Sequence, residues 1–238
     1  MTSKTELTKL NRAWRRDEFM DGLNKKPELL DFHDDRGRGW LHICAGVLLA
    51  PASSGPDRNS AKASIDLAQA LLDAGLDINA PAFIEGSWHA TPLWFAVGRG
   101  QNRPLAEFLL QSGSSPEHCL WAAAFNENVE MLHLLIEYGA PLEAIAEDET
   151  ALLHAVKWSK FDAARALLEA GCDPDFQDSK AMTALHYMLK KRSPKPHYEL
   201  FIEHQARGGI ANHDGMTAKQ IMDNKRDPDY ATLAAQLR

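Results

Sequence analysis

The sequence is poor in the features that mark membrane and secreted proteins. No apolar run approaches the roughly 18 residues that a membrane-spanning helix needs, and the first seven residues are not followed by the apolar segment of a secretory signal. Only three cysteines occur, Cys44, Cys119 and Cys172. This odd, dispersed set fits buried, reduced thiols better than a disulfide framework. These absences predict a cytoplasmic location.

Catalytic and cofactor-binding motifs are missing as well. The sequence has no Gly-x-x-x-x-Gly-Lys-Ser/Thr phosphate loop, no His-Glu-x-x-His, no Gly-x-Ser-x-Gly and no Cys-x-x-Cys. Cys119 directly follows His118, and adjacent residues on a helix point about 100° apart, so these two cannot form a nucleophile–base pair. We therefore expect no catalytic residues, no metal site, no cofactor and no enzymatic activity.

Basic residues are in the minority. The chain has 33 acidic and 26 basic residues, and from Glu117 to Asp178 there are thirteen acidic residues but only three basic ones. Because nucleic-acid phosphates would be repelled, this balance argues against DNA or RNA as a partner, and the short basic cluster around Lys190 is too small to reverse it. The acidic residues of this stretch either form a solvated surface or attract a partner protein with basic side chains.

What the sequence does contain is one pattern that returns at a fixed interval. Segments of the Leu-Leu-x-x-Gly type end at Gly75, Gly113, Gly139 and Gly171. The interval is 32 residues from Gly139 to Gly171 and 33 residues from Thr150 to Thr183. A fixed period of this length indicates stacked structural repeats rather than one globular core.

Each repeat carries the signals of two helices. A threonine can cap the first helix, and Pro92 after Thr91 is tolerated because the N–H groups of a first turn have no partner. In the second helix apolar residues recur at helical spacing, as at Val129, Leu132 and Ile136. The glycine that follows suits a left-handed helix stop. Since one helix pair cannot bury its apolar faces alone, neighbouring pairs must stack.

These segments resemble the ankyrin repeat, in which a β-turn, a short inner helix opened by Thr-Pro-Leu-His, and a longer outer helix are followed by a glycine-containing loop. The resemblance covers nearly the whole chain. It implies an all-α solenoid with about five internal repeats in a single domain. The implied parts are N-terminal capping helices at 1–33, internal repeats at 34–211 and a C-terminal cap at 212–238.

The resemblance also gives structural roles to several histidines and tryptophans. His42 and His186 occupy the Leu-His step, where the family's histidine hydrogen-bonds to backbone and threonine across neighbouring turns. His154 is expected to pack or to lie on a helix surface rather than to bind a ligand. Trp94 and Trp121 stand at the histidine position of their repeats, which favours packing between repeats.

Three stretches depart from the repeat. Residues 51–60 are rich in Pro, Gly and Ser and predict an inserted loop near 48–62. The long segment 80–88 predicts an enlarged turn between repeats. The short connection between Gly113 and Leu120 predicts that the usual turn is missing there. The binding surface should therefore be irregular.

In this family, partners are usually held by the turn fingers and by the exposed ends of the inner helices, which line a groove. Projecting the repeat onto this chain places twelve candidate protein-binding residues there. They are Arg36, Arg38, Trp88, Arg99, Phe125, Asn126, Glu147, Glu149, Lys157, Trp158, Lys180 and Lys190. The three aromatic candidates are the best hot spots, since such side chains bury much area at low entropic cost. Each could instead pack against a neighbouring finger.

The sequence thus predicts a non-enzymatic adaptor or inhibitor that binds a partner protein through this groove and is monomeric alone. A narrower hypothesis is an immunity-type inhibitor of a toxic enzyme. A hypothesis of another class is a protein that handles a small molecule or peptide, with residues 51–60 as a lid. Binding to nucleic acid or to a membrane is not expected.

Overall fold

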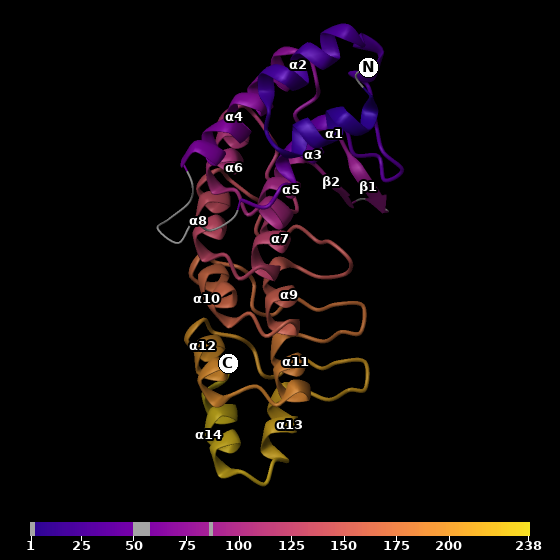
Figure 1. Ribbon diagram of the computed structural model, residues 1–238. Helices are drawn as coiled ribbons and strands as arrows, with labels where there is room; N and C mark the ends of the chain where they lie inside the picture. Colours follow the sequence, from indigo (N-terminus) through magenta and orange to yellow (C-terminus); the bar gives the residue numbers. More distant parts are fainter. Residues whose placement is uncertain (1–2, 50–57, 86–87) are drawn as a thin grey trace. The chain divides into compact units, whose positions relative to one another are not determined.

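The computed structural model describes residues 3–49, 58–85 and 88–238 of the chain. Its contacts form two compact units, Met1–Cys119 and Leu120–Arg238. In the described residues both units are built from helices, with one two-stranded sheet in the first (Figure 1). The all-α fold class predicted from the repeats is confirmed.

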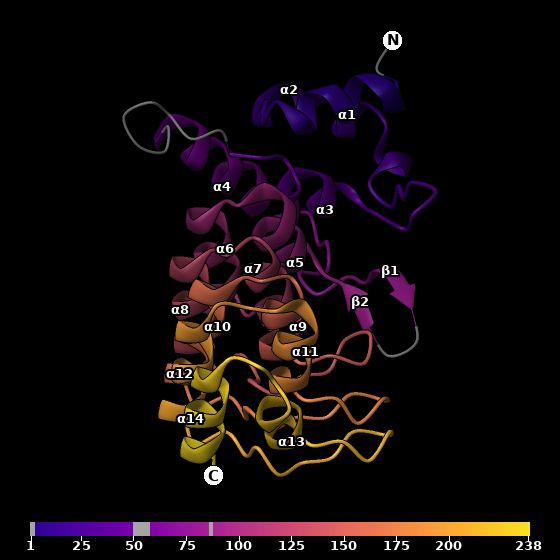
Figure 2. The same cartoon turned by 90° about the horizontal axis from the view of Figure 1, so that it is seen from below.

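The second unit is a regular stack of helix pairs. Its helices are α7 (Cys119–Phe125), α8 (Val129–Glu137), α9 (Ala151–Lys157), α10 (Phe161–Glu169), α11 (Ala184–Lys191), α12 (Lys195–Glu203), α13 (Ala218–Asp223) and α14 (Pro228–Gln236). The odd-numbered, inner helices form one row and the even-numbered, outer helices a second, and long loops project beside the inner row (Figures 1 and 2). Helix α9 packs against α10 and α11, which makes the stack continuous.

Threonine caps and glycine stops set the helix ends in this unit. The Thr150 hydroxyl accepts the N–H of Leu153 at 3.2 Å, and Thr217 and Gln220 cap α13 reciprocally. Gly139 and Gly171 have φ of +77° and +96°. A residue with a Cβ is strained in that left-handed region, so the predicted glycine stops are confirmed.

The loops that project beside the inner helices, here called fingers, are held by carboxylates and amides. In the finger before α11, Asp178 accepts the N–H groups of Lys180 and Met182 at 3.0 and 2.9 Å. Asn212 does the same for the finger before α13. Asp148, in the finger before α9, accepts the N–H of Ser179 at 2.9 Å. Neighbouring fingers are thereby tied to each other.

The first unit begins with helices that cover its apolar side. Its elements are α1 (Lys4–Arg12), α2 (Arg16–Lys25), η1 (Pro27–Leu29), α3 (Trp40–Ala45), α4 (Arg58–Asp73), β1 (Ala82–Glu85), β2 (Trp88–Ala90), α5 (Pro92–Phe95), η2 (Ala96–Gly100) and α6 (Arg103–Gln111). The fully buried rings of Phe19 and Trp40 meet edge to face, 5.2 Å apart. Asn11 and Trp14 donate hydrogen bonds to the carbonyls of Trp40 and Cys44, both at 3.1 Å.

The departures from the repeat lie mainly in this unit. The enlarged turn is the antiparallel pair β1–β2, with Ala82 opposite Ala90. The shortened connection is held by the side chain of Asn79, whose oxygen accepts the N–H of Ser115 at 2.9 Å. The predicted insertion near 48–62 extends too far, because residues from Arg58 onward are helical in α4. The rest of the Pro/Gly/Ser-rich segment, 50–57, lies outside the described residues.

The three cysteines are buried and unpaired. Burial raises the pKa of the Cys44 and Cys172 thiols to about 12, and it raises the pKa of Cys119 as well. In the part of the chain that the structure describes, no helix is both long and apolar enough to span a membrane.

Candidate protein-binding surface

Four rings of the second unit lie together at the ends of α7 and α9. They belong to Trp121 and Phe125 on α7, to His154 on α9, and to Trp158, which caps the C-terminus of α9. The members of each pair are four residues apart and so share a helix face. The centroid of the His154 ring lies 4.0 Å from that of Trp121 and 5.9 Å from that of Phe125, and Phe125 meets Trp158 edge to face at 5.8 Å. We call this group the aromatic cluster.

The aromatic cluster has a buried base and an exposed rim. His154 is 2% exposed, whereas Phe125 is 45% and Trp158 57% exposed. Among the large hydrophobic side chains of the described residues, Trp158 is the most exposed. Two neighbouring exposed rings on a buried base form an apolar patch of the kind that marks interaction sites.

The histidine of the aromatic cluster stands one residue later in its repeat than the histidine of α11 does. In α11 the third residue after the Thr183 cap is His186, which accepts the N–H of Thr183 at 3.2 Å and donates to the carbonyl of Met216 at 3.0 Å. This is the predicted role, and His42 in the first unit has an equivalent one. In α9 a leucine takes the third position and His154 the fourth, which turns the imidazole toward the rings.

A carboxylate fixes the displaced histidine. The Nδ1 of His154 donates to the Oε2 of Glu149 at 2.8 Å, and Lys157 pairs with the other oxygen. The Nε2 of His154 is buried and has no hydrogen-bond partner among the described residues. Burial would raise the pKa of Glu149, but the hydrogen bonds from His154 and Lys157 outweigh it and lower that pKa. Glu149 is only 8% exposed, so it supports the aromatic cluster from beneath.

Two lysines lie beside the aromatic rim. The Lys157 ammonium stands 5.0 Å from the centroid of the Tyr187 ring, and the Lys191 ammonium donates to the carbonyl of Lys157. The Tyr187 hydroxyl in turn donates to Asp178, so burial and this carboxylate both raise the tyrosine pKa. The residue next to Trp158 is therefore held by contacts from α11.

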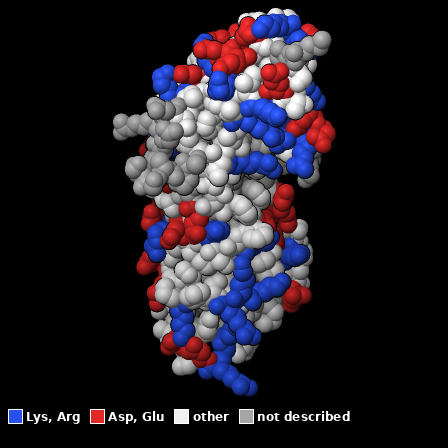
Figure 3. All heavy atoms as spheres, in the orientation of Figure 1, with Lys and Arg blue, Asp and Glu red and all other residues white. Residues whose placement is uncertain are grey.

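Lys and Arg side chains gather over the row of inner helices of this unit. Figure 3 shows a basic stripe that follows α9, α11 and α13. Lys190, Lys191 and Arg192, at the end of α11, are all exposed. Within the described residues none of these three forms an ion pair with a carboxylate. Of the thirteen acidic residues between Glu117 and Asp178, four lie on the outer helices α8 and α10.

The twelve predicted binding residues divide between the two units. In the second unit the exposed ones are Phe125, Trp158, Glu147, Lys180 and Lys190, and the half-buried ones are Asn126 and Lys157. Glu149 is buried. The structure thus brings only Phe125, Glu149, Lys157 and Trp158 into or against the aromatic cluster.

The other four predicted residues belong to the first unit. Arg36 and Arg38 lie 5.7 and 6.0 Å from the centroid of the Phe83 ring, and Arg38 also pairs with Asp34. Arg99 lies 5.7 Å from the centroid of the Phe95 ring. Trp88 is the first residue of β2, and its side chain is outside the described residues.

Sequence reasoning missed His154 and Tyr187 as parts of the site and treated Trp121 as packing. Two signals were present. The histidine follows Thr150 by four residues but Thr183 by three, and both Trp121/Phe125 and His154/Trp158 have the i, i+4 spacing of one helix face. Among the described residues, no group of three or more His, Cys, Asp or Glu side chains is placed to hold a metal ion.

Known sequences match this chain over its repeats. Residues 93–178 match the family model for ankyrin repeats, in three copies. A putative ankyrin repeat-containing protein of Treponema pallidum is 31% identical over 44% of this chain and 35% of its own length. The ankyrin repeat protein nuc-2 of Neurospora crassa is 33% identical over 35% of this chain and 9% of its own. The chain thus spans about a third or less of the curated relatives it matches.

Known structures match over more of the chain. The human ASB11 ankyrin repeat domain superposes with a TM-score of 0.71 at 17% identity, over 98% of this chain and 97% of that domain. An ankyrin repeat domain from Acinetobacter baumannii AYE gives a TM-score of 0.62 at 21% identity, over 86% of this chain and all of that domain. At these identities the likeness shows a shared fold.

Proposed function

We propose that this chain, an ankyrin-repeat protein, acts as an adaptor or inhibitor that binds a partner protein through the aromatic cluster of its second unit. Ankyrin repeats are generally protein–protein interaction modules. The observation that carries the proposal is the exposure of Phe125 and Trp158, in edge-to-face contact above a buried, hydrogen-bonded base. Because both rings remain largely exposed, they contribute little to the buried core, and their exposure is better explained by contact with a partner.

The rigidity of the base supports a role in binding. His154 is held by Glu149, and Lys157 is held by Glu149 and by the ammonium of Lys191. A surface that is already ordered loses less conformational entropy on association. Exposed tryptophan on such a base fits the description of a binding hot spot.

The charges beside the rings indicate the chemistry of the partner. The acidic stretch of the sequence suggested a partner with basic side chains, but four of its thirteen acidic residues lie on the outer helices α8 and α10, and Glu149 beside the rings is buried and paired with Lys157. The groups beside Trp158 are Lys157, at the end of α9, and Lys191, at the end of α11. The proposed partner therefore presents an apolar side chain flanked by acidic ones, because complementary charges speed association.

Replacement of one ring tests the proposal. Trp158→Ala should weaken binding of the partner by about 2 kcal/mol or more, roughly 30-fold, while changing the free energy of unfolding by only about 0.5 kcal/mol. The partner is first identified as a protein retained from extracts of the source organism by the wild-type chain. Its affinity is then measured with purified proteins.

Tyr138→Ala is the matched control, because Tyr138 is also an exposed aromatic residue but caps the outer helix α8. It should leave the affinity within about two-fold. In addition, Lys191→Glu should slow association at low salt more than at high salt if the partner's surface is acidic. Equal losses for Trp158→Ala and Tyr138→Ala, or an unchanged affinity in a folded Trp158→Ala variant, would place the binding surface elsewhere.

A further inference from the structure

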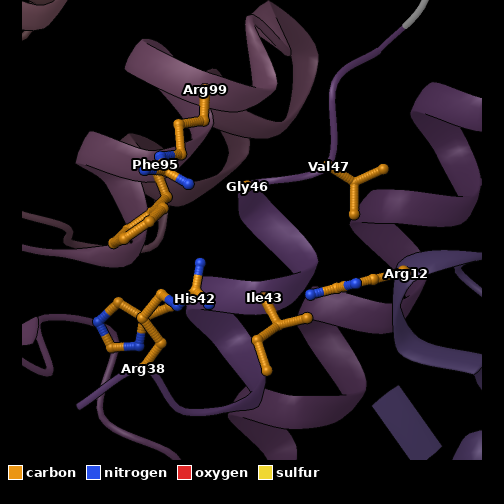
Figure 4. Close-up of a pocket in the computed structure, with 8 residues that line it drawn as sticks. All are labelled: Arg12, Arg38, His42, Ile43, Gly46, Val47, Phe95 and Arg99. Atoms are coloured by element: carbon orange, nitrogen blue, oxygen red, sulfur yellow. The ribbon is translucent and has the colours of Figure 1, made fainter. Parts of the chain in front are cut away.

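A cavity of about 250 Å³ in the first unit is lined by three arginines. Arg12 reaches it from α1, Arg38 from the segment before α3, and Arg99 from η2. In Figure 4, Arg12 points toward Ile43 from one side of the cavity, and Arg38 and Arg99 lie on the opposite side. Three guanidinium groups from three separate elements therefore converge on one space.

Two of these guanidinium groups have no carboxylate partner in the described residues. Arg38 is paired with Asp34 at 2.6 Å, and both side chains are largely buried, which fixes its orientation. Arg99 contacts the face of the Phe95 ring, and Arg12 forms no ion pair within that part of the chain. None of the residues that line the cavity is acidic. The cavity therefore has a net positive charge.

The histidine in the wall adds no charge to the cavity. His42 accepts the N–H of Gly39 at 3.2 Å and donates to the carbonyl of Ala80 at 2.9 Å, which leaves both ring nitrogens occupied. Burial lowers its pKa to about 4, so the imidazole is neutral at physiological pH. The positive charge of the cavity comes from the arginines.

The position of Arg12 is determined by its neighbours. Asn11 donates to the carbonyl of Trp40, and Trp14 donates to the carbonyl of Cys44, so both sides of Arg12 are anchored to α3. The last turn of α1 is thus fixed against the helix that forms the floor of the cavity. The Arg12 side chain is exposed, but the anchored backbone on both sides of it keeps this residue next to the cavity.

We propose that this cavity is a binding site for an oxyanion, a carboxylate or a phosphate, carried on a small apolar group. Guanidinium groups bind such anions through paired, charge-assisted hydrogen bonds. Ile43, Val47 and Phe95 supply an apolar wall, which strengthens those interactions by excluding water. The volume is several times the roughly 30 Å³ of one water molecule, which suits one side chain or one small organic anion.

The proposal concerns the first unit and does not depend on the aromatic cluster. The anion would cancel the repulsion between Arg12 and Arg99 and would connect α1 to η2. The helix that caps the first unit would thereby also form part of a binding site.

The test titrates the full chain with phenyl phosphate, benzoate and neutral benzyl alcohol by isothermal calorimetry. At least one of the two anions should bind saturably and the alcohol should not. Arg12→Gln and Arg99→Gln should each weaken anion binding roughly ten-fold. Arg103→Gln is the matched control, because it removes one charge from the same unit at a guanidinium already paired with Glu107 on α6. It should change the affinity by less than about two-fold.

A second titration identifies the source of the anion. A short Gly/Ser peptide that carries one phosphotyrosine should bind at least ten-fold more tightly than phenyl phosphate if the site receives a side chain of a protein, and no more tightly if it receives a free anion. Circular dichroism melts confirm that each variant is folded. Absence of saturable binding for both phenyl phosphate and benzoate, or equal weakening by Arg103→Gln, would overturn the proposal. Trp158→Ala should leave anion binding unchanged, so this site and the proposed function can fail separately.

Discussion

Helices α9 and α11 begin with the same threonine cap, but their histidines stand one position apart. His186, three residues after Thr183, connects the start of α11 to the next finger through two backbone hydrogen bonds. His154, four residues after Thr150, bonds only to a side chain, Glu149, and faces the aromatic cluster. A shift of one residue rotates a helical side chain by about 100°. In this repeat the rotation removes a structural hydrogen bond and supplies the base of an exposed surface.

The largest effect expected from this comparison is at His186. His186→Ala leaves the N–H of Thr183 and the carbonyl of Met216 without their buried partner, so it should lower the free energy of unfolding by about 2–4 kcal/mol. Urea denaturation followed by circular dichroism measures this. His133→Ala removes an exposed histidine from α8 and should cost less than about 0.5 kcal/mol. A loss for His186→Ala as small as that control would show that the two bonds do not stabilise the fold.

A smaller effect is expected at His154. His154→Ala removes one hydrogen bond to Glu149, but Lys157 still neutralises that carboxylate, and the Nε2 atom has no partner to lose. The expected loss is about 1–2 kcal/mol in the same urea experiment. The near-ultraviolet circular dichroism of the tryptophans should also change, because the imidazole contacts Trp121 and Trp158. If His154→Ala lowers the free energy of unfolding as much as His186→Ala does, the two histidines contribute equally to the fold.

The smallest effect concerns pH. The folded-state pKa of Glu149 is lowered, so its ionised form stabilises the fold above its ordinary pKa of 4.5, and this contribution is lost as the pH falls below that value. Glu149→Gln should therefore show a shallower loss of stability between pH 5 and about 3 than the wild type. Glu147→Gln, an exposed residue of the same finger, is the control. Parallel curves for the wild type and Glu149→Gln would show that the carboxylate is not stabilised by His154 and Lys157.

The regular parts of the fold could be predicted because each depends on a short sequence signal. The threonine caps, the left-handed glycines and the Leu-His contacts of His42 and His186 follow from local rules and the repeat. The exceptions required tertiary information. The length of segment 80–88 predicted an enlarged turn there, but not the pairing of β1 with β2, and the repeat pattern gave no start for α4 at Arg58.

The candidate sites divide in the same way. The exposed positions of Phe125 and Trp158 could be predicted from their places at the ends of inner helices. The buried position of Glu149 could not, because it depends on the displaced His154 and on Lys157. The arginine cavity could not be predicted either, since Arg12 lies in a helix outside the repeat pattern and meets Arg99 only after α1 packs against α3.

The burial of the three thiols makes them internal reporters of local unfolding. Cys44 lies in α3, Cys119 at the start of α7 and Cys172 after α10, and each is inaccessible to an alkylating reagent in the closed state. Because burial also raises their pKa, almost no reactive thiolate is present until the surrounding helices separate. The rate at which each cysteine is labelled would therefore measure how often its own repeat opens, without any engineered probe.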